Sequence, residues 1–367
     1  MLLEFKRRAQ PSRFAQWTAP VVAFALTLLT GALIFLSLGK DPMAGLYYFF
    51  VEPLTAAWSL EEVAVKMIPL AIIAIGLCVC FLSSTWNIGA EGQFIVGALA
   101  GSAVPILLPG FDGPLMLPLM MLCGFAGGMA YGLIPATLKV RFGANEILTS
   151  LMLVYVAELL LDWLVRGPWR NPEGFNMPES APFPVSGRVP ELPFIDADRL
   201  TIALVIAVIA AIVVQFMIRR TIFGFSVRLA GIAPRAAAFA GYDANRTVLL
   251  ALGVSGGLAG LAGILEVAGP IGQLRPAISP GYGFTAIIVA FLARLSPIGC
   301  LAAAFVLSLT YIGGEGAQIA MGLSDKMARV FQGILLFWAL VADAFVFYEV
   351  RLKRAPAIGP SAEAADA

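Results

Sequence analysis

The stretch FLSSTWNIGAEGQFIVGALAG, residues 81–101, decides the fold of this chain. An apolar run is interrupted there by Asn87, Gly89, Glu91 and Gln93, and it then resumes at once. In a soluble protein such a break is a polar turn between two buried helices. In a membrane protein it places a carboxylate and two amides at the depth of the hydrocarbon, where they are tolerated only inside protein or along a cavity. The solvent around the chain therefore determines what the stretch means.

The composition identifies that solvent as a lipid bilayer. Hydrophobic residues make up 60% of the chain and charged residues 13%, and the mean hydropathy is +0.89. In soluble domains about 25% of residues are charged. Apolar runs of about 20 residues, long enough to span a bilayer, recur along the chain. The sequence therefore predicts an all-α, multi-pass membrane protein of the inner-membrane type.

Apolar runs bounded by charges, glycine and proline predict ten membrane segments within one transmembrane domain, residues 19–348. The segments are 19–38, 66–86, 91–109, 114–138, 147–165, 200–218, 247–267, 282–294, 297–314 and 327–348. Lys and Arg favour alternate loops, so the positive-inside rule places the terminal segments 1–18 and 349–367 in the cytoplasm together with residues 219–246. Residues 166–199, rich in proline and mixed in charge, are predicted to form a periplasmic loop.

Two glycine-rich interruptions mark corresponding positions in the two halves of the chain. The first is NIGAEGQ at 87–93, and the second is GPIGQLRPAISPGYG at 269–283. Such paired breaks are typical of transporters with interrupted helices around a central pathway, and they suggest an inverted repeat.

The polar residues near these breaks have two interpretations. They line the path and contact solute, or they satisfy backbone groups and helix ends that the breaks set free. Glu91 would then cap the start of its own segment, and Asn145 with Glu146 would cap the segment that follows them rather than gate the path. Glu158 and Glu266 are acids near membrane depth and are functional candidates by default. The candidate path or helix-break residues are Asn87, Gly89, Glu91, Gln93, Asn145, Glu146, Gln273, Ser279 and Tyr282.

No catalytic or metal-binding set is predicted. Histidine is absent, no Walker A sequence occurs, and the four cysteines lie in apolar runs where they pack as small hydrophobic residues. Gly253-Val254-Ser255-Gly256-Gly257 comes close to a nucleophile elbow, but the small residues of 255–263 are spaced for close helix packing in lipid. We therefore expect no enzyme activity and no cofactor held by this chain.

The segment 219–246 contains a short predicted helix. A glycine turn, a proline at the helix start, an alanine face and a glycine stop follow one another there. A helix of this kind docks into a groove on another protein or lies on the membrane surface. The residues of the pattern are Gly231, Pro234, Arg235, Ala236, Ala237, Ala240 and Gly241.

Four motifs together give the chain a specific resemblance: NIGAEGQ (87–93), GANEILTSLML (143–153), G-x-x-P-x-A-A-x-x-A-G (231–241) and GYGF (281–284). Over about residues 60–345 the chain resembles permease subunits of bacterial ATP-binding-cassette (ABC) importers for branched-chain amino acids, ribose and nucleosides. The first motif is similar to that of the nucleoside and simple-sugar branch.

The resemblance implies a function and a set of partners. The expected function is inward transport of a nucleoside or related sugar-containing solute. The implied partners are ABC ATPase subunits that use the ATP, a second permease subunit (homologous or identical), and a periplasmic or lipoprotein binding protein. Membrane lipid is a further partner, and no nucleic acid is expected. Gly231–Gly241 would be the helix that couples the permease to the ATPase. The alternatives are a branched-chain amino acid or simple-sugar ABC permease, and an ion-coupled secondary transporter.

Overall fold

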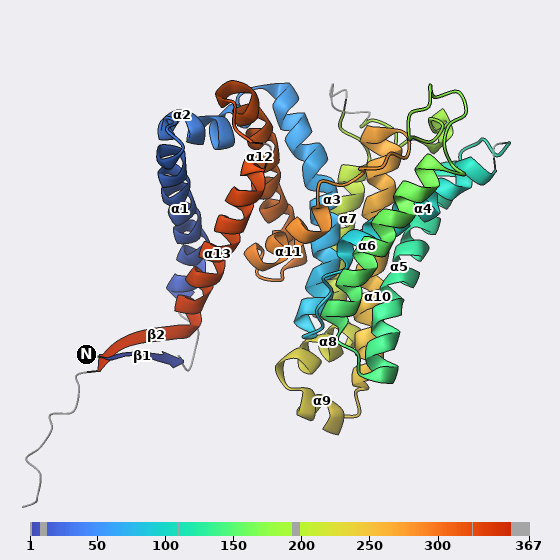
Figure 1. Ribbon diagram of the computed structural model, residues 1–367. Helices are drawn as coiled ribbons and strands as arrows, with labels where there is room; N and C mark the ends of the chain where they lie inside the picture. Colours follow the sequence, from blue (N-terminus) through green and yellow to red (C-terminus); the bar gives the residue numbers. More distant parts are fainter. Residues whose placement is uncertain (1, 8–12, 109, 193–198, 325, 354–367) are drawn as a thin grey trace, which may run out of the picture. The chain divides into compact units, whose positions relative to one another are not determined.

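The computed structural model describes residues 2–7, 13–108, 110–192, 199–324 and 326–353. The chain divides into two compact units. The larger unit comprises Met43–Gln332, and the smaller one combines the residues before Met43 with those after Gln332. Each is described by itself below, and Figure 1 gives the labels of the elements.

Helices occupy all ten predicted segments. Their bounds are α1 Arg13–Ser37, α3 Ala57–Leu82, α4 Ala90–Leu107, α5 Met116–Phe142, α6 Glu146–Arg166, α7 Ala203–Arg220, α10 Ala244–Glu266, α11 Tyr282–Leu292, α12 Pro297–Met321 and α13 Met327–Phe347. Within the described residues, seven of these are long and apolar enough to cross a membrane, namely α3 to α7, α10 with the turn after it, and α12. The prediction of an all-α membrane protein is confirmed.

Several helices run further than predicted because charged residues near their ends are helical. Helix α3 begins nine residues before the predicted start at 66, so Glu61 and Glu62 lie on its first turns and not in a loop. Helix α12 continues past Glu315 to Met321. Charges near the end of a membrane helix reach water, so they do not mark the end of the helix.

Short elements connect the long helices. In the larger unit these include α8 (Ile222–Ile232) and α9 (Pro234–Phe239), with π-helical and 3-10 turns at η1 (Tyr47–Val51), η2 (Glu52–Leu54), η3 (Val185–Gly187) and η4 (Val267–Ile271). Helix α2 spans Pro42–Leu46.

The smaller unit adds a two-stranded ribbon that the all-α prediction does not contain. Strand β1 (Leu2–Arg7) pairs antiparallel with β2 (Tyr348–Lys353), with Leu2 opposite Lys353. The sequence of β2, YEVRLK, alternates apolar and charged residues with the period of a strand.

The core of the larger unit is built from helices whose backbones approach closely. Helices α4, α5, α6 and α10 lie side by side (Figure 1). At their contacts, an added Cβ on Gly97 or Gly128 would collide with the backbone of Gly260 on α10. Small residues allow such contact between helices in lipid. The run 255–263 therefore packs helices, as predicted.

The larger unit has two distinct ends. Helices α8 and α9 lie at one end, and residues 167–192 lie at the other (Figure 1). In the structure the non-helical part of the first interruption shifts to residues 83–89, and that of the second narrows to residues 272–281.

Candidate functional site

The amides of the first interruption bind one another and a neighbouring helix. Asn87 Nδ2 donates to Gln93 Oε1 at 2.8 Å and to Ser255 Oγ of α10 at 2.9 Å. Gln93 Nε2 donates back to Asn87 Oδ1 at 3.0 Å, and the backbone N–H of Gly89 donates to the same oxygen at 3.2 Å. All three side chains are buried. In this state the network satisfies the polar groups that the break exposes.

Glu91 joins the two interruptions. Its Oε2 accepts a hydrogen bond from the backbone N–H of Gly283 at 2.5 Å, across 192 residues of sequence. A Cβ added to Gly283 would collide with the backbone of Glu91, so only glycine allows this approach. The carboxylate therefore caps the start of α11, and not the start of its own helix as predicted from the sequence.

A second side chain accepts hydrogen bonds from backbone N–H groups at the start of α11. Ser279 Oγ accepts hydrogen bonds from the backbone N–H groups of Gly281 (3.1 Å) and Tyr282 (3.0 Å). Together with Glu91 it occupies the first free N–H groups of the helix. The N-terminus of this short helix carries a positive partial charge, and that charge already has a protein carboxylate beside it.

Tyr282 connects this junction to a buried acid on α10. Its side chain is fully buried, and its hydroxyl donates to Glu266 Oε1 at 3.4 Å. The Tyr282 ring lies edge-on to Phe94 and to Tyr311. Lys66 Nζ lies 5.9 Å from the ring centroid. Lys66 was not predicted as a site residue, although a single lysine within an apolar run was a usable signal.

A further set of hydrogen-bonded polar side chains includes Tyr311, and it was not predicted from the sequence. Thr285 Oγ1 and the Tyr311 hydroxyl are 2.8 Å apart, and Thr285 donates to Gln332 Oε1 at 3.2 Å. Gln332 Nε2 donates to Thr310 Oγ1 at 3.2 Å. All four side chains are buried, so they link the first turn of α11 to α12 and α13.

Gln273 is not brought to this junction. Its Nε2 donates to Glu179 Oε2 at 2.6 Å. The neighbouring backbone also pairs with the 166–199 segment, since Ser180 N–H donates to Leu274 O and Phe183 N–H to Gly272 O. The second interruption thus receives part of its hydrogen bonding from that segment.

Asn145 and Glu146 stabilise the start of α6. Asn145 Oδ1 accepts from the backbone N–H of Ile147 at 2.9 Å, which is the geometry of an N-cap. Glu146 forms an ion pair with Lys139 of α5 and accepts from the backbone N–H of Trp86 at 3.5 Å. These contacts tie α5, α6 and the first interruption together.

The segment 219–246 forms two short helices, and the first of them, α8, contacts the end of α3. Proline starts α9, as predicted, and Gly241 ends it with a φ of +81°. Gly231 lies against the carbonyl of Leu82, and Ser84 Oγ donates to Gly231 O at 3.3 Å. Helix α8 is therefore in direct contact with the first interruption.

The structure corrects the predicted face of α9. Ala237 is only 5% exposed and lines a pocket of about 240 Å³ between α9, α10 and the end of α3. Its side chain therefore faces the rest of its own chain. Arg235, Ala236 and Ala240 are exposed, and so is Phe239, whose exposed fraction is 95%. The glycine–proline–alanine pattern of the sequence predicts a helix with a small-residue face and does not indicate Phe239.

Residues 59–340 match the model of a family described as "Branched-chain amino acid transport system / permease component". The chain belongs to this family. The permease is 34% identical to a glucose ABC transporter permease protein of Haloferax volcanii, with 94% of this chain and 92% of the relative covered. It is 29% identical to a nucleoside ABC transporter permease protein of Lactococcus lactis subsp. cremoris (93% and 94% covered). A guanosine ABC transporter permease protein of Bacillus subtilis is 28% identical (93% and 98% covered).

These comparisons confirm the resemblance inferred from the motifs. In this permease, the motif at 87–93 supplies the residues that hold the two interruptions together, and 231–241 forms the exposed α9 and the contact with Leu82. The permease thus combines a buried polar junction with a surface helix linked to it.

Proposed function

We propose that this chain is the permease subunit of an ABC importer that moves a nucleoside or a related sugar-containing solute inward. In this proposal the chain lies in the bacterial inner membrane with both termini in the cytoplasm. Separate ATPase subunits hydrolyse ATP, a periplasmic or lipoprotein binding protein delivers the solute, and a second permease subunit, identical or homologous, completes the membrane part. Residues 19–348 are the membrane domain, flanked by the cytoplasmic segments 1–18 and 349–367.

The observation that favours a sugar-containing solute over an amino acid is the cap on α11. Transporters of amino acids use the N-termini of half-helices to bind the substrate carboxylate. Here Glu91 occupies that place with a hydrogen bond to Gly283 N–H. A second carboxylate there would be repelled, so the junction suits an uncharged solute. The glucose, nucleoside and guanosine permeases among the relatives support the same solute class.

The exposed face of α9 is the proposed ATPase contact. Phe239 supplies an aromatic anchor beside the small residues Ala236 and Ala240, which leave room for a groove to close around it. Movement of α9 would reach the first interruption through the contact of Gly231 with Leu82 and Ser84. ATP-driven closure of the ATPases would thereby shift the population between inward-open and outward-open states.

Reconstitution tests this proposal. The permease is placed in liposomes with its ATPase subunits and binding protein, and uptake of a radiolabelled nucleoside is measured with and without ATP. We expect uptake that requires ATP and the ATPase. Uptake driven by an ion gradient, with no ATPase present, would establish the ion-coupled alternative and refute the proposal.

A further inference from the structure

Helix α6 carries an exposed acid within its membrane-spanning length. Glu158 is exposed, and none of the described residues forms a hydrogen bond or an ion pair with it. The last turns of α6 carry the exposed Trp163, a residue type enriched at the membrane surface, and an ion pair between Arg166 and Asp162 at 2.7 Å. Glu158 lies one helical turn deeper than this pair. An unpaired carboxylate that faces lipid at this depth is costly and rare, which argues against lipid as its neighbour.

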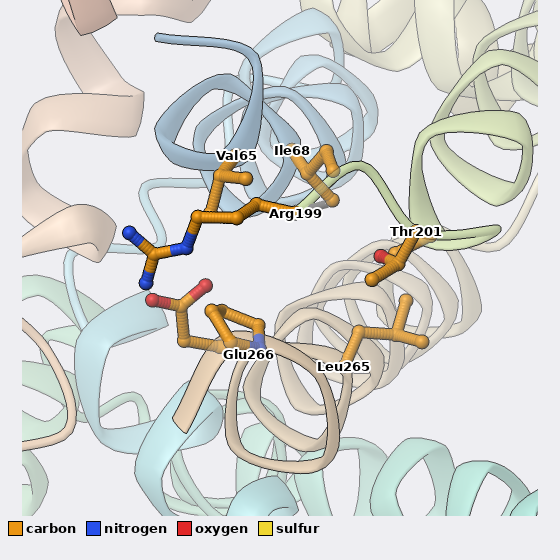
Figure 2. A pocket seen from close by; sticks show the side chains of 8 residues that line it. Val65, Ile68, Arg199, Thr201, Leu265 and Glu266 are labelled. Carbon is orange, nitrogen blue, oxygen red and sulfur yellow. The ribbon is translucent and has the colours of Figure 1, made fainter. Parts of the chain in front are cut away.

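The other acid at membrane depth, Glu266, has different surroundings. It is only 6% exposed and accepts a hydrogen bond from the Tyr282 hydroxyl at 3.4 Å. The cavity that it lines has a volume of about 10 Å³, which is at the limit for one water molecule (Figure 2). Glu266 therefore has no room for a solute beside it, whereas the side chain of Glu158 is accessible.

Glu158 belongs to one flank of α6 that also carries Tyr155 and Asp162. Spacings of three and four residues place these side chains on the same side of the helix. Tyr155 is 56% exposed. The neighbouring exposed face of α6 is apolar and suits lipid, and its residues are Met152, Val156 and Leu159. One membrane helix thus presents two exposed surfaces of different chemistry.

The polar flank lies near the junction of the two interruptions. Glu158 is close enough to Glu91 for the two carboxylates to interact electrostatically, and α4, which carries Glu91, packs on α6. Glu91 in turn binds the backbone N–H of Gly283 at the start of α11. Transporters with interrupted helices bind their solutes at such junctions, so the flank is well placed to meet the solute.

We propose that Tyr155 and Glu158 line a water-filled solute path and contact the solute there. The carboxylate of Glu158 accepts hydrogen bonds from hydroxyl groups of a sugar. The ring of Tyr155, one turn away on the same flank, packs against the face of a sugar ring or a base. Water in the path solvates the unpaired charge that lipid would not. This inference rests on the proposed function and adds to it the residues that contact the solute.

Cysteine labelling tests this inference in the complex of permease, ATPases and binding protein, reconstituted in liposomes. Tyr155→Cys and Glu158→Cys are made separately in a chain that also carries Cys123→Ala, because the other three cysteines are buried. Leu159→Cys is the matched control, at nearly the same depth on the apolar face. A charged, membrane-impermeant methanethiosulfonate reagent is applied to both sides of the membrane. The protecting solute is guanosine or glucose, whichever the wild-type complex takes up with ATP.

We expect Tyr155→Cys and Glu158→Cys to react about a hundredfold faster than Leu159→Cys, because hydrocarbon excludes both the charged reagent and the thiolate that it attacks. We also expect the solute to slow both reactions. Rates as low as that of Leu159→Cys, or rates that the solute does not change, overturn the inference; ATP-dependent uptake by the wild type then leaves the proposed function intact. A wild-type complex that takes up neither solute with ATP overturns the proposed function, and this inference with it.

Discussion

The bond between Glu91 and Gly283 gives the sharpest prediction about the fold. Glu91→Ala removes the acceptor from a backbone N–H that is held at 2.5 Å inside the protein. A hydrogen bond to a charged group contributes about 1.5–3 kcal/mol, and a buried donor left without an acceptor costs a similar amount. We therefore expect a loss of about 3 kcal/mol. Glu91→Gln keeps an acceptor oxygen and loses only the charge at the N-terminus of α11, for a loss of about 1 kcal/mol.

Thermal unfolding of the purified permease in detergent measures these differences. We expect the midpoint to fall in the order wild type, Glu91→Gln, Glu91→Ala. Glu173→Ala is the matched control, because Glu173 is an exposed acid outside the membrane helices. Equal midpoints for Glu91→Ala and the wild type would show that the carboxylate does not hold the two interruptions together, and the argument for an uncharged solute would lose its basis.

Two further variants test the packing and the polar network. Asn87→Ala removes both hydrogen bonds between Asn87 and the buried amide of Gln93 and should cost about 3 kcal/mol. The same thermal assay checks this, and a loss no larger than that of Asn245→Ala, at an exposed position of α10, would contradict it. Gly260→Ala places a Cβ 2.8 Å from Gly128 Cα, so the yield of folded protein in size-exclusion chromatography should fall sharply. Gly333→Ala, where an added Cβ meets nothing within 4 Å, should leave the yield unchanged, and equal yields for both glycine variants would refute the packing argument.

The sequence predicts helix positions well in this chain because lipid imposes one simple requirement. A segment that spans the bilayer must be apolar over about 20 residues. All ten predicted segments contain a helix, and within the described residues seven of these helices meet that requirement. The ends of the helices are predicted less accurately, because charged side chains such as Glu62 reach water while their backbone remains helical. The interruptions are also visible in sequence, because glycine and amides stand out within an apolar run.

The partners of the site residues depend on tertiary contacts that local pattern does not encode. Glu91 and Gly283 are 192 residues apart, and an acid in the first turn of a helix predicts a cap on that same helix. Likewise, the alanine pattern at 236–240 does not reveal which side faces the protein. Ala237 packs inward while Phe239 is exposed, since each orientation is set by how α9 packs on α8 and α10.

One comparison tests most directly the claim that ATPases drive this permease through α9. Phe239→Asp and Phe175→Asp both place a charge at a phenylalanine that is almost fully exposed, one on α9 and the other in the 166–199 segment. Reconstituted complexes of both variants are measured for ATP-dependent nucleoside uptake. We predict that Phe239→Asp folds normally but loses most of its ATP-dependent uptake, while Phe175→Asp keeps its dependence on ATP. Wild-type, ATP-dependent uptake by Phe239→Asp would contradict the account.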